Sequence, residues 1–242
     1  EKIEIFYTLT DSFRSSFVLW LSKSKKRIGY NSQGRGFFLT SKVKLPLKKI
    51  HRYKKYLKLI EKDDIPSEKT LIYFKKEEVE WAKHEIEEIG IENPVGLFPF
   101  SVSETRTFPN GKISEWLNGS RENFLIFGAK NDGQKANVII NENKNISIVS
   151  LCGKYSLRQS MALISLCKYA LAADSGLGHI SSIIKVPTIS FFGANRAFVT
   201  KPLGKSCVVI DQSNRCSPCK KNICCLKSIH KDDVNSSINS LI

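Results

Sequence analysis

The chain alternates short apolar runs with longer segments in which apolar residues recur every three or four positions. Short apolar runs are typical of buried strands, and the longer period is typical of helices that pack one face on a core. The pattern predicts strands at 4–8, 95–98, 124–127, 146–150, 169–173 and 188–192. It predicts helices at 13–21, 50–60, 77–89 and 112–119, one beginning at 156, and one ending at 185. This alternation favours an α/β fold with a doubly wound parallel sheet.

Turn-forming residues follow three of the predicted strands. Pro99, Gly128 and the run Asp174-Ser175-Gly176 each stand where an apolar run ends. Because ligands of such sheets bind at the carboxyl ends of the strands, these positions predict one shared crevice.

The stretch ALAADSGLGHIS, residues 170–181, predicts a strand, a tight turn and a helix start. Glycines at 176 and 178 let a ligand approach the backbone, and the first amides of a helix lack partners within the helix. Together with the helix dipole they form a site for a phosphate or pyrophosphate. The alternative is an ordinary βα turn with an Asp or Ser N-cap. His179 then either contacts a phosphate or sugar hydroxyl, or packs under its helix.

The positive charge is concentrated at one end of the chain. The net charge is +15, and residues 1–62 hold 16 Lys and Arg against 4 Asp and Glu, a balance of +12. Such a field attracts nucleic acid, anionic lipid headgroups or a phosphorylated glycan, although a lysine-rich solvated surface is the alternative. No nucleic-acid-binding motif is present, so nucleic acid is not an expected partner.

The sequence contains no signal-peptide pattern and no apolar run that could cross a bilayer. Seven cysteines without a secretory signal favour a reducing compartment. We therefore expect a cytoplasmic protein, with peripheral contact on the inner face of the inner membrane as an option.

Five segments in a fixed order carry a resemblance to a known family. They are PFSVSETRTFP, LIFGAKND, SLRQSMALISLCKYALAADSGLGHISS, VPTISFFGANRAFVTKPLG and CSPCKKNICCLKSI. The chain resembles glycosyltransferase family 9, the lipopolysaccharide heptosyltransferases, and most closely the heptosyltransferase II branch. N-terminal segments such as DSFRSSFV and KRIGYNSQGRGFFLT extend the resemblance over nearly the whole chain.

The resemblance implies a GT-B-like fold of two Rossmann-like domains that face each other across a cleft. Residues 1–91 would be the remainder of the acceptor-side domain, and 92–242 the nucleotide-sugar-binding domain. The implied reaction is an inverting, metal-independent transfer of heptose from ADP-L-glycero-D-manno-heptose to a phosphorylated acceptor in the lipopolysaccharide inner core, without a cofactor. The implied donor-binding residues are Ser101, Arg106, Gly128, Asp174, Ser175, Gly176, His179 and Thr200. Candidate acceptor-binding residues in the basic quarter are Arg14, Arg27, Arg35 and Arg52.

The chain departs from the family pattern in two places. The family's N-terminal strand and its G-D turn, with the aspartate implied to act as general base, have no counterpart before Asp11. The sequence therefore predicts a weak catalyst, because a missing base costs about 10²–10⁴-fold in rate. A fragment of a longer enzyme, a nucleotide-sugar-binding protein without catalysis, and a polyanion- or membrane-binding module remain alternatives. Gly178, where the family often has a bulkier residue, is expected to loosen the sugar pocket.

Four cysteines near the C-terminus form a further candidate site. A zinc or iron–sulfur site, a disulfide and plain thiols are all compatible with the spacing of Cys216, Cys219, Cys224 and Cys225. Adjacent cysteines rarely chelate one ion, so reduced thiols without a metal are the favoured interpretation.

Overall fold

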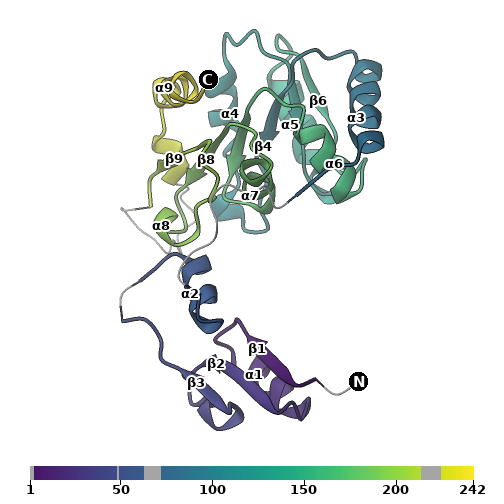
Figure 1. The fold of residues 1–242 in the computed structure, drawn as a ribbon. Helices are drawn as coiled ribbons and strands as arrows, with labels where there is room; N and C mark the ends of the chain where they lie inside the picture. The colour runs from purple at the N-terminus through teal and green to yellow at the C-terminus, as the bar shows by residue number, and fades with distance from the viewer. Residues whose placement is uncertain (1–2, 48, 63–71, 214–224) are drawn as a thin grey trace. The chain divides into compact units, whose positions relative to one another are not determined.

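The computed structural model describes residues 3–47, 49–62, 72–213 and 225–242. The chain divides into two compact units, Glu1–Glu68 and Lys69–Ile242, here called the N-terminal and C-terminal units. Each unit has its own parallel sheet (Figure 1).

The N-terminal unit is built on three parallel strands in the order β1-β2-β3. Helix α1 connects β1 to β2, and Ser12 caps it by accepting a hydrogen bond from the Ser15 amide at 3.2 Å. The Tyr30 hydroxyl, at the end of β2, donates to the Lys55 carbonyl at 2.6 Å and so ties the sheet to α2. The elements are β1 (Ile5–Thr8), α1 (Phe13–Leu21), β2 (Lys26–Tyr30), η1 (Arg35–Phe38), β3 (Ser41–Val43) and α2 (Arg52–Leu59).

The C-terminal unit has a six-stranded parallel sheet in the order β6-β5-β4-β7-β8-β9. Its strands are β4 (Val95–Phe98), β5 (Phe124–Ile126), β6 (Ile148–Ser150), β7 (Ala170–Ala173), β8 (Thr188–Phe192) and β9 (Cys207–Asp211). Its α-helices are α3 (Lys76–Ile89), α4 (Asn110–Leu117), α5 (Gly133–Glu142), α6 (Leu157–Ile164), α7 (Gly176–Ile183), α8 (Ala197–Thr200) and α9 (Lys231–Leu241). Four 3₁₀ turns occur in the described chain: η1, η2 (Glu104–Arg106), η3 (Lys130–Asp132) and η4 (Cys225–Ser228).

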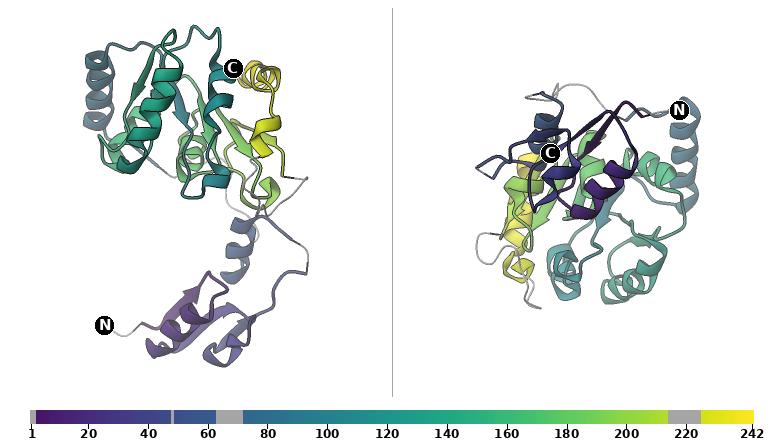
Figure 2. Two further views of the ribbon diagram at one scale, coloured as in Figure 1. Left: turned by 180° about the vertical axis from the view of Figure 1, so that it is seen from behind. Right: turned by 90° about the horizontal axis from the view of Figure 1, so that it is seen from below.

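Helices cover both faces of this sheet (Figures 1 and 2). Successive residues of a strand point to opposite faces, so each strand contributes to two cores. In β4, Leu97 packs with α4, α5 and α9, whereas Phe98 packs with α3 and α6. The doubly wound parallel sheet expected from the sequence is confirmed.

The division between the units differs from the expected boundary near residue 92. It lies between residues 68 and 69, because α3 packs against α6 and shares its core. Arg158 of α6 reinforces this packing with bonds of 2.6 and 2.7 Å to the Glu78 carboxylate of α3. The helix expected at 77–89 therefore belongs to the C-terminal unit.

Candidate functional site

The carboxyl ends of β4 and β7 meet at the point where the sheet changes direction. From β4 the chain proceeds through β5 and β6 on one side, and β7, β8 and β9 extend the sheet on the other. Such a switch point leaves a crevice at the carboxyl edge of an open α/β sheet. Ser101 follows β4 and Asp174 follows β7, so both residues lie at this point.

Asp174 joins the loops at this edge of the sheet. Its carbonyl accepts hydrogen bonds from Ser101 Oγ at 3.1 Å and from Arg106 Nη1 at 3.2 Å. Its carboxylate accepts a bond from Asn195 Nδ2 at 2.6 Å and lies 3.7 Å from Arg106 Nη1. The carboxylate is almost completely buried. Asp174 therefore holds the loops that follow β4, β7 and β8 in one arrangement.

Helix α7 begins directly after Asp174. The Ser175 N-cap has an extended backbone, and its side chain makes no capping hydrogen bond to the first turn. A Cβ added at Gly176 would meet nothing within 4 Å, so this backbone lies open. The unpaired amides and the positive end of the helix dipole thus stand beside the partly buried guanidinium of Arg106.

Gly178 lies at the close contact between α7 and β7. A Cβ at this position would lie 2.9 Å from Ala172 Cβ and 3.4 Å from the Ala173 carbonyl oxygen. Glycine at 178 therefore lets α7 pack closely on β7.

The remaining predicted donor residues lie around this edge. His179 is half-buried in the first turn of α7, and Thr200 ends α8, between β8 and β9. The buried hydroxyl oxygens of Ser175 and Thr200 have no hydrogen-bond partner among the described residues. The Gly204 amide donates to Ser182 Oγ at 2.9 Å and fastens the loop after α8 to α7.

Gly128 follows β5, next to β4 in the sheet. A Cβ here would lie 2.8 Å from the Phe100 ring and 2.9 Å from Cys152 Sγ. Gly128 therefore lets the loops after β4, β5 and β6 pack together.

Sequence reasoning missed Asn195, which orients the Asp174 carboxylate. The available signal was its position just after Gly193, at the end of a buried strand that neighbours β7. An amide side chain at this position can donate a hydrogen bond to the residue that follows β7, the neighbouring strand of the sheet.

The four candidate acceptor arginines fall into two groups. Arg14 and Arg52 are exposed, on α1 and α2. Arg27 donates to the carbonyls of Phe38 and Ser24, both at 2.8 Å. The Arg27 guanidinium therefore closes a loop of the N-terminal unit.

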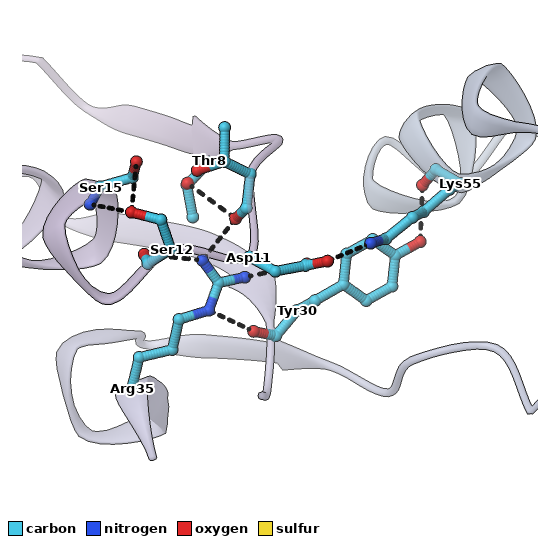
Figure 3. Close-up of polar contacts among 8 residues, drawn as sticks. Thr8, Asp11, Ser12, Ser15, Tyr30, Arg35 and Lys55 are labelled. Atoms are coloured by element: carbon cyan, nitrogen blue, oxygen red, sulfur yellow. Dashed lines mark hydrogen bonds and ion pairs between the residues drawn. The ribbon is translucent and has the colours of Figure 1, made fainter. Parts of the chain in front are cut away.

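Arg35 is completely buried (Figure 3). Its guanidinium donates to the Tyr30 carbonyl at 3.0 Å, to the Ser12 carbonyl at 3.2 Å, and to the Thr10 carbonyl. Its Nη2 lies 3.6 Å from Asp11 Oδ1. Three of these partners follow β1 and Tyr30 ends β2, so the side chain connects the ends of the two strands. The expectation that Arg35 faces an acceptor was wrong: its donors point into the unit.

Asp11 completes the cluster in Figure 3 by pairing with Lys55 of α2. Burial lowers the pKa of the Arg35 guanidinium, and the Asp11 charge opposes that shift. Burial raises the pKa of Tyr30, and Asp11 raises it further. The Asp11 charge therefore offsets part of the cost of burying the Arg35 guanidinium inside the N-terminal unit.

The cysteine site is largely beyond the structural description. Cys216, Cys219 and Cys224 lie outside the described residues, and Cys225 is partly buried at the start of η4. Within the described ranges, no group of three or more His, Cys, Asp or Glu residues is placed to hold a metal ion. Nor does any helix in those ranges have the length and apolar character that crossing a membrane requires.

Known proteins resemble the whole chain. It is 25% identical to lipooligosaccharide heptosyltransferase 2 of Campylobacter jejuni, in an alignment that covers 99% of this chain and 76% of that protein. It is 24% identical to lipooligosaccharide heptosyltransferase 2 of Haemophilus influenzae, over 87% of this chain and 66% of that protein.

Solved structures share the fold. The structure of Escherichia coli ADP-heptose lps heptosyltransferase II matches with a TM-score of 0.77 at 20% identity, over 98% of this chain and 76% of that one. E. coli heptosyltransferase WaaC with ADP matches with a TM-score of 0.70 at 13% identity, over 100% and 74%. The likeness confirms the GT-B-like α/β fold. The model of glycosyltransferase family 9 (heptosyltransferase) matches residues 1–230, and the chain therefore belongs to this family of glycosyltransferases.

Proposed function

We propose that the chain transfers heptose from ADP-L-glycero-D-manno-heptose to a phosphorylated inner-core acceptor of lipopolysaccharide, by inversion and without a metal. The relatives from C. jejuni and H. influenzae bear the name lipooligosaccharide heptosyltransferase 2. The E. coli structure solved with ADP supports a nucleoside diphosphate as part of the donor. We place this reaction in the cytoplasm, with the acceptor presented at the inner face of the inner membrane.

One feature of the site carries this proposal: the open first turn of α7 at the β4–β7 switch point, with Arg106 beside it. Diphosphate oxygens would accept hydrogen bonds from the first amides of α7, at the positive end of the helix. His179, in the same turn, would contact a phosphate or a sugar hydroxyl.

These groups also suit the chemistry of the transfer. The acceptor hydroxyl attacks the anomeric carbon from the side opposite the diphosphate and releases its proton to water, while the C–O bond to the diphosphate breaks and the configuration inverts. Negative charge then develops on the leaving ADP. The helix dipole and the Arg106 guanidinium stabilise that charge, which is the task a divalent cation performs in other enzymes. The acceptor side of the proposal uses the exposed Arg14 and Arg52.

Calorimetric titration with ADP, UDP and GDP in EDTA tests the donor site. We expect saturable binding of ADP, and a loss of about 10- to 100-fold in affinity for Arg106→Ala, the value of a hydrogen bond to a charged group. Gly176→Val should also weaken binding, because its side chain would cover the open amides. Arg121→Ala is the matched control, since this exposed arginine precedes β5 at the opposite edge of the sheet.

Each other outcome has a defined meaning. A preference for UDP or GDP would replace the donor, and a requirement for Mg²⁺ would contradict the metal-free assignment. Absence of binding to all three nucleotides would refute the proposed site. Binding of ADP without transfer of heptose from ADP-heptose would favour the second candidate, a nucleotide-sugar-binding protein without turnover.

A further inference from the structure

The carboxylate of Asp174 lies between an amide and a guanidinium. Asn195 Nδ2 donates to Oδ2 of this carboxylate at 2.6 Å, and Arg106 Nη1 lies 3.7 Å from the same oxygen. The first contact is a hydrogen bond, whereas the second is an ion pair too long to be one. The Asp174 side chain is 7% exposed, so its charge needs a close partner, and the short bond from Asn195 supplies it.

Asn195 satisfies this carboxylate without adding a charge. An ionised carboxylate only accepts hydrogen bonds, so the side-chain NH₂ of Asn195, and not its carbonyl oxygen, faces Asp174. The loops that meet here follow β4, β7 and β8, which are neighbouring strands of the sheet in that order. Ala173 pairs with Phe191, so the parallel register brings the ends of β7 and β8 level and places Asn195 beside Asp174.

The Arg106 guanidinium is held at one of its nitrogens. Nη1 donates to the Asp174 carbonyl at 3.2 Å, which is the only hydrogen bond that the guanidinium makes to the described residues. A guanidinium carries five N–H donors in a planar fork that can bind two phosphate oxygens at once. The Arg106 side chain is 26% exposed, so part of it reaches solvent. If the Asp174 carboxylate took this fork in a bidentate pair, it would withdraw both donors and charge from a bound phosphate.

We propose that Asn195 is a positioning residue for the donor diphosphate. Its hydrogen bond to the Asp174 carboxylate keeps the Arg106 guanidinium from closing onto that carboxylate, and so leaves the guanidinium for the diphosphate oxygens. The inference rests on the proposed donor site and deepens it, because it names the contact that decides how much positive charge a nucleoside diphosphate meets there. Asn195 acts through Asp174 and Arg106, without a contact of its own to the substrate.

Titration with ADP and with adenosine tests the proposal in four forms of the full chain: unaltered, Asn195→Ala, Arg106→Ala and the double variant. Asn195→Ala should weaken ADP about 10-fold, the value of a hydrogen bond to a charged group, and should not change the affinity for adenosine, which has no phosphate. In the Arg106→Ala background, the same replacement should change the ADP affinity less than about 2-fold, because the guanidinium through which it acts is gone. A merely structural role would weaken both ligands, and equally in both backgrounds.

Asn195→Asp tests the role of charge, since it keeps the shape of the side chain and places a second carboxylate against Asp174. Two carboxylates would hold Arg106 more tightly than one, so the ADP affinity should fall about 10- to 100-fold at pH 8. Relative to the unaltered chain, the affinity should recover towards pH 5, as the two carboxylates take up a proton.

Asn123→Ala is the matched control. Asn123 also joins two loops of the C-terminal unit, through a 3.0 Å bond from its Nδ2 to the Glu92 carbonyl. It directly precedes β5, at the amino ends of the strands, so its loss should leave the affinity for ADP unchanged.

Modification of Arg106 by phenylglyoxal, read by mass spectrometry, needs no nucleotide. The reagent adds to a guanidine that has lost its proton, and pairing with a carboxylate disfavours that loss. Asn195→Ala should therefore slow the modification of Arg106 severalfold, whereas Asn123→Ala should leave its rate unchanged.

The outcomes separate this inference from the proposed function. Equal losses of ADP and adenosine affinity, or equal effects of Asn195→Ala with and without Arg106, would overturn the positioning role. An unchanged rate of Arg106 modification in Asn195→Ala would overturn it as well. Slower modification in Asn195→Ala, together with no binding of ADP to the unaltered chain, would support the control of Arg106 by Asn195 and refute the donor site.

Discussion

Replacing Arg35 with methionine should unfold the N-terminal unit selectively. Methionine keeps most of the side-chain volume but removes the three donated hydrogen bonds and the charge beside Asp11. The carbonyls of Tyr30, Ser12 and Thr10 would then lose a buried donor. Asp11 would keep Lys55 as its partner.

The expected loss is large relative to the stability of this unit. Removing one partner of a buried charge network costs about 3–5 kcal/mol. Because Asp11 keeps its ion pair with Lys55, we expect Arg35→Met to lie at the lower end of this range, about 3 kcal/mol. The unit spans residues Glu1–Glu68, for which a total stability of roughly 3–10 kcal/mol is typical. The substitution therefore removes about 30% or more of that stability.

Hydrogen exchange read by mass spectrometry separates the two units. In Arg35→Met, protected amides in residues 3–47 should exchange about 100-fold faster, while the six-stranded sheet keeps its protection. Arg14→Met is the matched control, because it removes an exposed arginine from the same unit. Equal protection of residues 3–47 in the two variants would refute the structural role of Arg35.

Three further predictions concern the C-terminal unit. Gly178→Ala should destabilise the C-terminal unit by about 1–3 kcal/mol, because the added Cβ would crowd β7. Gly176→Ala has open space at its Cβ and should stabilise α7 slightly. Urea unfolding should show a lower free energy of unfolding for the first variant and a slightly higher one for the second. The hydrogen bond from Arg158 lowers the pKa of Glu78 to about 2. The ionised Glu78 therefore contributes its full stabilisation of the folded state above the pKa of an unfolded carboxyl, and this contribution declines as the pH falls towards 2. Between pH 6 and 2, the Tm of Glu78→Gln should therefore fall less steeply than that of the unaltered chain. Burial, and then the hydrogen bond to Glu85, raise the pKa of Tyr155 to about 12. The unfolded chain loses this proton near pH 10, so the free energy of unfolding should fall as the pH rises above 10. An equal alkaline fall in the Tm of Tyr155→Phe would contradict this.

Local pattern was sufficient for most elements of the fold. Strand β8 and helix α1 lie within the expected ranges, because a buried apolar run and a 3.6-residue period depend on neighbouring residues. Helix α3 ends as expected at Gly90, which has a φ of 73° that favours glycine. Helix α9 was missed because few of its residues are apolar and its packing partners lie far away in the sequence, whereas strand β9 was missed although it is a mostly apolar run.

The sequence by itself determined the α/β class and the turn at Asp174, since both follow from short-range patterns of apolar, polar and glycine residues. Only the tertiary structure decided that Asn195 and Arg106 meet Asp174, because strand order brings these residues together. It alone distinguished the buried Arg35 from the exposed Arg14, although both are single arginines in the same basic segment. The physical reason is that burial and hydrogen-bond partners are set by contacts between residues distant in the chain, which local periodicity does not encode.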